Sequence, residues 1–156
     1  RAPLIVDRDF VGFAIWFHDA IYEPGRPDNE EHSAAWAEAA LPPGARTDRV
    51  ARVIRMTKDH AKGDADADEA LFLDMDIAIL GAPREVYAAY ANDIRAEFSH
   101  VPDPLFDAGR SAFLKSQLAR GRLFRTDFYE RELAGAARHN MILELGALIV
   151  RGVAGV

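Results

Sequence analysis

Three short stretches of the sequence place acids, imidazoles and a cation among large apolar residues. They contain the pair His18 and Asp19 in FAIWFHDAIY, the acids Asp74 and Asp76 in LFLDMDIAIL, and the cation Lys58 with the imidazole of His60 in TKDH. Burying such groups is costly unless a hydrogen bond, an ion pair or a metal ion compensates them. Acids and imidazoles from two separate apolar segments can compensate one another by binding one divalent cation.

Helical geometry limits which of these side chains can share an ion. Neighbours on a helix point about 100° apart, so the imidazole of His18 and the carboxylate of Asp19 can converge on an ion that lies between them. Asp74 and Asp76 are two positions apart and point to nearly opposite faces. Only one of these two aspartates can therefore bind the same ion.

Each stretch also has a purely structural interpretation. The side chains of His18 and Asp19 can hydrogen-bond to each other and to nearby backbone groups. Either Asp74 or Asp76 can cap a neighbouring helix. Lys58 and His60 can complement the negative end of a helix dipole at a helix C-terminus. In DNEE, Asp28 at the cap position and Glu31 three residues later form a capping-box pattern. Asn29 and Glu30 can also reach the candidate site, but that pattern already accounts for them.

The composition is typical of one globular domain spanning residues 1–156, with 49% apolar and 28% charged residues. A formal net charge of −6 argues against a surface that binds the phosphates of nucleic acid. The chain has no cysteine, so a metal would be held by nitrogen and oxygen atoms. No segment reaches the roughly 18 uncharged apolar residues of a membrane span. We expect a cytoplasmic protein with no membrane or nucleic-acid partner.

Helical periodicity runs through the whole chain, and no alternating strand pattern of useful length interrupts it. The sequence therefore predicts an all-α domain of about seven helices. Asp7 caps the first helix, whose apolar residues recur at helical spacing as far as Ile21. The second helix starts near Asn29, and the third runs from Thr47 to about His60.

Caps and helix breakers define the second half of the chain. Residues 69–80 have helical composition, and Gly81 is placed to close that helix in a left-handed conformation. Pro83 is expected at the first position of the next helix, and Asp103 opens another. Thr126 caps a long last helix.

Six blocks follow one another from about Val11 to Glu144: WFHDAIY, DNEEHSA, TKDH, LDMDIAILGA, IRAEFSHV and RLFRTDFYERELAGAARHN. Together they resemble a bacterial family described as predicted metal-dependent phosphohydrolases of the HD superfamily. The resemblance implies an all-helical, HD-domain-like bundle. In that fold a histidine, an adjacent histidine-aspartate pair and a distant aspartate hold a divalent metal.

The resemblance implies a role for each residue that matches the family's motif. His18 and Asp19 correspond to the pair. Asp76 corresponds to the distant aspartate ligand, which leaves Asp74 as a supporting or structural group. His60 corresponds to the extra histidine that some HD proteins use for a second metal.

One ligand of the family is missing from these blocks. The family's first metal histidine lies on a helix upstream of the pair, and residues 1–12 contain no histidine. Because the sequence does not begin with methionine, we expect this histidine in a segment that precedes it. Histidine and carboxylate ligands suit manganese, iron, zinc, cobalt, nickel or magnesium.

The resemblance implies hydrolysis of a small phosphorylated substrate, such as a nucleotide, by a water molecule that the metal activates. Asp19 would hold both the metal and the water, and Glu23 or His60 would move protons. Lys58 would neutralise phosphate charge. Arg110 belongs to a basic run that either binds phosphate or forms a solvated face.

Two other hypotheses compete with the hypothesis that the chain is an enzyme. The chain can be a non-catalytic HD-like module that binds a small ligand or a protein partner, or His18 and Asp19 can be purely structural. A homo-oligomer is compatible with each of these hypotheses.

Overall fold

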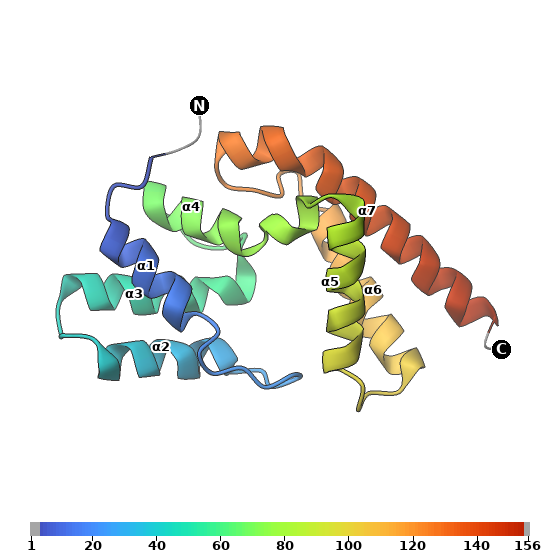
Figure 1. Cartoon of the computed structure of the whole chain (residues 1–156), viewed down its shortest axis with the longest axis horizontal. Coiled ribbons are helices and arrows are strands. Elements are labelled where there is room, and N and C mark those ends of the chain that lie inside the picture. Colours follow the sequence, from blue (N-terminus) through green and yellow to red (C-terminus); the bar gives the residue numbers. More distant parts are fainter. Residues whose placement is uncertain (1–3, 155–156) are drawn as a thin grey trace. The chain divides into compact units, whose positions relative to one another are not determined.

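The computed structural model describes residues 4–154, with side chains described from 4 to 152 (Figure 1). This part of the chain contains seven α-helices, two short 3₁₀ helices and no β-strand, which confirms the all-α prediction. The chain divides into two compact units, Arg1–Asp76 and Ile77–Val156. The expectation of a single HD-like domain stays a prediction.

The first unit is a small helical bundle. It consists of α1 (Arg8–Phe17), α2 (Asn29–Ala40), α3 (Ala45–Met56), the 3₁₀ helix η1 (Thr57–Asp59) and α4 (Ala67–Asp76). α2 packs along α3, and α1 lies against α2, α3 and α4. The largest buried side chains of this core are Phe10, Val50, Val53, Ile54, Phe72 and Leu73.

The start of α1 is fixed by two aspartates. Asp7 caps the helix as predicted, because its Oδ1 accepts a hydrogen bond from the Phe10 amide at 3.0 Å. Asp68, in the first turn of α4, accepts hydrogen bonds from the amides of Val6 and Asp7 at 2.9 and 2.7 Å. The amino ends of α1 and α4 are therefore tied together.

The capping box predicted for α2 is wrong, although the helix does begin at Asn29. The Asp28 side chain makes no cap hydrogen bond, because its oxygens accept from Arg26 Nε at 2.7 Å and contact His32 Nε2 at 3.0 Å. Glu31 does not return to the cap either. Its two oxygens are bound by the guanidinium of Arg55 at 2.7 and 2.8 Å.

The second unit is built around one long helix. It contains the 3₁₀ helix η2 (Ala78–Gly81), α5 (Arg84–Glu97), α6 (Asp103–Leu118) and α7 (Asp127–Ala154). α7 packs against η2, α5 and α6. Thr126 caps α7 as predicted, because its Oγ1 accepts from the Tyr129 amide at 3.3 Å. The core includes Leu80, Leu114, Leu123, Phe124 and Met141.

The helix predicted over residues 69–80 is wrong at both ends, since α4 covers Ala67–Asp76 and a 3₁₀ turn follows it. Gly81 does not adopt the left-handed conformation expected of a helix-closing glycine. Its lack of a side chain serves packing instead. A Cβ atom at this position would lie 2.7 Å from the Cβ of Leu133 and 2.9 Å from its carbonyl oxygen.

Replacing Gly81 with alanine should lower the free energy of unfolding by about 1–3 kcal/mol, because α7 must move away from η2 to admit the methyl group. Gly146, in the exposed middle of α7, is the matched control, since nothing lies within 4 Å of a Cβ built there. Gly146→Ala should stabilise the protein by about 0.5–1 kcal/mol. Urea denaturation followed by circular dichroism measures both changes.

By length and composition α7 is able to cross a membrane over Asp127–Gly152, a criterion that core helices of soluble proteins also meet. In the second unit one side of α7 is buried through Ala137, Met141 and Leu148. The cytoplasmic location expected from the sequence stays a prediction.

Candidate functional site

Four of the residues singled out in the sequence meet in the first unit. Nε2 of His60 lies 2.7 Å from Oδ2 of Asp76, and Nε2 of His18 lies 3.3 Å from Oδ1 of the same carboxylate. Oδ2 of Asp19 is 3.4 Å from the same nitrogen of His18. Side chains up to 58 positions apart in the sequence therefore form one cluster of two imidazoles and two carboxylates.

The ends of helices place these side chains. His18 is the C-cap of α1, where its amide donates to the carbonyl of Ala14 at 3.0 Å. His60 follows η1 as its C-cap, and Asp76 is the last residue of α4. The apolar residues before His18 bury α1 against the core, so they fix the helix end from which the imidazole projects.

The ring of His18 is oriented by two contacts. Its Nδ1 lies 2.9 Å from the carbonyl oxygen of Ile15, which only accepts, so Nδ1 carries the proton and donates. The ring also meets the edge of Phe72, with centroids 5.6 Å apart. Nε2 consequently points toward Asp19 and Asp76, as in metal sites where a backbone carbonyl fixes the other ring nitrogen.

The charges of the cluster support one another. The neighbouring carboxylate of Asp76 raises the pKa of His18 to about 9, against the opposing effect of burial. Burial alone would raise the pKa of Asp76, but hydrogen bonds and charge from His18 and His60 outweigh it and hold the pKa well below its usual value. At neutral pH Asp76 is therefore a carboxylate and His18 an imidazolium, and a cation that binds Nε2 would release a proton.

The turn that follows the pair is fixed from α2. Ser33 Oγ accepts from the amide of Ile21 at 3.0 Å and donates to its carbonyl at 3.1 Å. The buried side chain of Asn29 accepts a hydrogen bond from the backbone amide of Glu23 at 3.0 Å and donates one to its carbonyl at 2.8 Å. These bonds hold the first turn of α2 beside the end of α1.

Glu23, predicted to move protons, and Lys58, predicted to neutralise phosphate charge, both contact other parts of the first unit in this conformation. The Glu23 side chain is 72% exposed, and its carboxylate lies 3.7 Å from Arg26 Nη1. Lys58 Nζ donates to the carbonyl of Pro27, which ties η1 to the turn before α2. Asp74 is almost fully buried, whereas Asp76 reaches the cluster.

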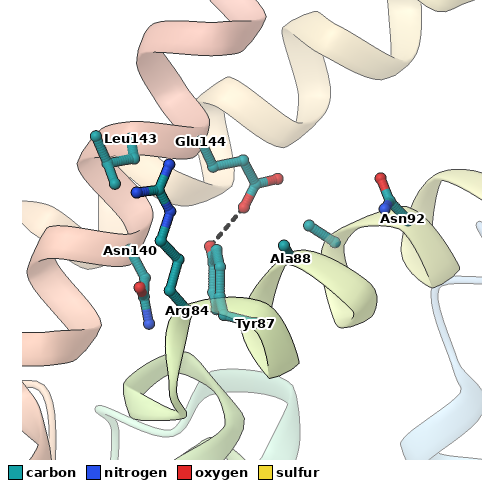
Figure 2. A pocket seen from close by; sticks show the side chains of 8 residues that line it. Arg84, Tyr87, Ala88, Asn92, Asn140, Leu143 and Glu144 are labelled. Carbon is teal, nitrogen blue, oxygen red and sulfur yellow. Dashed lines mark hydrogen bonds between the residues drawn. The ribbon is translucent and has the colours of Figure 1, made fainter.

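Arg110, the predicted phosphate-binding arginine, belongs to the second unit. Its guanidinium is nearly buried, and Nε and Nη2 bind the carboxylate of Glu144 at 2.7 and 3.1 Å. Tyr87 donates its hydroxyl to the same carboxylate (Figure 2). Arg84 and Asn140 line the hollow beside this bond. A role of Arg110 in binding substrate stays a prediction.

Glu30 is a residue that the sequence interpretation set aside as part of a cap. It is partly buried, and its side chain has no hydrogen bond or ion pair with any residue in the described part of the chain. It shares a helical stripe with Ala34, Ala37 and Leu41, which face the core. The spacing i, i+4, i+7, i+11 was a signal present in the sequence.

The donor atoms of the cluster suit a divalent first-row metal, since they are two imidazole nitrogens and carboxylate oxygens without a thiolate. Within residues 4–152, no three such side chains already surround a common point in the way that ligands surround an ion. The rings and carboxylates contact one another instead.

A search for related proteins found no matching family model, no matching curated protein and no matching solved structure.

Proposed function

We propose that the chain is a metal-dependent phosphohydrolase of HD type, which acts on a small phosphorylated substrate such as a nucleotide. One observation carries the proposal: both oxygens of Asp76 are engaged by imidazole nitrogens, at 3.3 Å from His18 and 2.7 Å from His60. The partly buried carboxylate of Asp76 is thus flanked by imidazoles from two separate segments, and imidazole and carboxylate are the ligand types that suit a divalent first-row metal.

In this proposal His18, Asp19 and Asp76 hold the metal, and His60 either adds a ligand or orients Asp76. A divalent cation supplies the Lewis acidity that makes water nucleophilic near neutral pH and polarises a phosphoryl oxygen. The protein's own part is to fix the ligands. The Ile15 carbonyl aims the imidazole of His18, and Asn29 and Ser33 hold the turn that carries Asp19.

Lys58 is the cation of the first unit that best fits the phosphate in this proposal. It follows α3 in the same short segment as His60, and its present partner, the Pro27 carbonyl, is a neutral acceptor. A phosphate oxygen is a stronger acceptor for an ammonium group than a carbonyl.

Metal analysis of the purified protein together with phosphate release tests the proposal. We expect a divalent metal at about one ion or more per chain, and hydrolysis of p-nitrophenyl phosphate after the metal-free protein receives Mn²⁺, Co²⁺, Ni²⁺ or Mg²⁺. His18→Ala and Asp19→Ala should each remove the metal and keep the helical circular dichroism spectrum. Full occupancy in both variants would refute the assignment. Metal binding without hydrolysis of any phosphoester would favour the non-catalytic module.

A further inference from the structure

Glu30 is a partly buried acid in the first turn of α2. It lies on the side of α2 that carries Ala34 and Ala37, both fully buried. Its carboxylate has no hydrogen bond or ion pair with any described residue. The amino end of the helix favours a negative charge here, but an exposed acid such as Glu31 meets that need without losing hydration.

The amino end of α2, where Glu30 lies, is held at the same end of the first unit as the cluster. The Ser33 side chain is hydrogen-bonded to the backbone of Ile21, and Ile21 lies three residues after His18. The Lys58 side chain donates a hydrogen bond to the Pro27 carbonyl, and the 3₁₀ helix that carries Lys58 has His60 as its C-cap. In Figure 1 α2 starts on the side of the first unit where α3 and α4 end.

Its neighbour Glu31 behaves differently although the two acids are adjacent. Glu31 is exposed and points to the outside of the bundle, where Arg55 binds both of its oxygens. Because neighbours on a helix point about 100° apart, Glu30 is turned from that surface toward the core side of α2. Its partial exposure shows that water reaches it there.

The other acids and imidazoles near the pair are less suited to take a proton. The carboxylate of Glu23 is largely exposed and lies near the cation of Arg26. Nε2 of His60 is engaged by Asp76 at 2.7 Å. A base must lie within hydrogen-bond reach of the proton that it takes, and the Glu30 carboxylate is the acid here whose oxygens no described residue engages.

We propose that Glu30 is the base that takes a proton from the attacking water. The inference rests on the phosphohydrolase function proposed above. The water oxygen bonds to phosphorus, the ester P–O bond breaks, and the proton taken by Glu30 passes to the departing oxygen. Water and a phosphomonoester thus give an alcohol and phosphate, with no oxidant, reductant or further reactant.

Glu30→Gln and Glu30→Ala test the inference against the matched control Glu31→Gln. We expect both Glu30 variants to lose about 100-fold or more in kcat for p-nitrophenyl phosphate, measured as released phosphate, and Glu31→Gln to stay within about twofold. Metal content should be unchanged in all three. In the metal-free protein the urea midpoint of both Glu30 variants should stay close to that of the wild type, because the carboxylate has no partner among the described residues and only its weak attraction to the amino end of α2 is lost.

The outcomes separate this inference from the function beneath it. Wild-type kcat in the Glu30 variants, alongside a wild type that binds metal and hydrolyses the ester, overturns the inference alone. Loss of the folded circular dichroism spectrum in both Glu30 variants assigns the residue a structural role and also overturns it. A wild type that neither holds metal nor releases phosphate overturns the proposed function, and the role of Glu30 with it.

Discussion

Replacing Asp76 with asparagine should lower the affinity of the metal-free protein for Mn²⁺ by at least about 100-fold, since changing even a supporting residue of a metal site costs 10–100-fold. Both His18 and His60 contact the carboxylate of Asp76. The amide has the same shape but lacks the charge that attracts the cation. Calorimetric titration at pH 7.5 measures the affinity, and phosphate release should fall in parallel.

The fold should survive this change. The amide oxygen of asparagine can still accept from one imidazole, so we expect a loss of only about 1–2 kcal/mol in the free energy of unfolding. The helical circular dichroism spectrum should be retained. An Asp76→Asn protein that binds Mn²⁺ as tightly as the wild type would show that this cluster is not the metal site.

Asp74 provides the matched control because it lies two positions away on the same helix. It is 1% exposed and has an interaction partner of its own. Asp74→Asn should therefore destabilise the protein by about 1–3 kcal/mol while leaving the affinity for Mn²⁺ within a few-fold. The reverse pattern, with metal binding lost in Asp74→Asn alone, would assign the ligand to Asp74.

Local sequence signals predicted those helix boundaries that depend on local contacts. Asp7 and Thr126 cap α1 and α7 because each accepts from an amide three residues ahead. The same rule failed at Asp28 because Arg26 and His32, close by on either side, are stronger partners for its carboxylate than a backbone amide. Competition among side chains is not contained in a capping pattern.

Contacts between distant segments set the features that the sequence did not predict. The role of Gly81 depends on Leu133, which lies 52 positions later in the chain. Arg110 belongs to a basic run in the sequence, but in the structure it forms a buried ion pair with Glu144. Neither pairing follows from periodicity or from local composition.

Only part of the candidate site could be predicted from the residue types and their spacing. Helical geometry showed that Asp74 and Asp76 cannot serve the same ion, but the choice of Asp76 depended on a resemblance to other sequences. The structure brings Asp76 to His18 and His60. Glu30 was set aside because a capping pattern offered a sufficient explanation for every acid in DNEE.

Replacing Glu144 with leucine should lower the free energy of unfolding by about 3–5 kcal/mol, because it leaves the Arg110 guanidinium buried without a counter-ion. The carboxylate binds two nitrogens of Arg110 and accepts from the Tyr87 hydroxyl (Figure 2). Burial and the neighbouring Glu144 charge raise the pKa of Tyr87, so its hydroxyl stays protonated and keeps donating. Tyr90 and Phe113, whose ring centroids lie 5.4 and 5.1 Å from the guanidinium, cannot replace a full charge.

A second ion pair between the same two helices supplies the control. Arg151 of α7 binds Asp107 of α6 at 2.8 and 3.1 Å, but its side chain is 51% exposed. Arg151→Gln should cost only about 1–2 kcal/mol, because the Arg151 side of this pair is open to water and the glutamine amide can still donate to Asp107, whose side chain is 13% exposed. Urea denaturation of both variants compares a buried arginine with a half-exposed one across one helix interface.

The double variant Arg110→Met with Glu144→Leu distinguishes a stranded charge from lost packing. If the cost of Glu144→Leu comes from the unpaired guanidinium, removal of both charges should recover most of the lost stability, since apolar replacements of a buried pair are often neutral or stabilising. The Tyr87 hydroxyl then loses its acceptor, which leaves a residual cost of about 1–3 kcal/mol that Tyr87→Phe should relieve. A double variant as unstable as the sum of the two single variants would show that the pair holds α6 and α7 through shape rather than through charge.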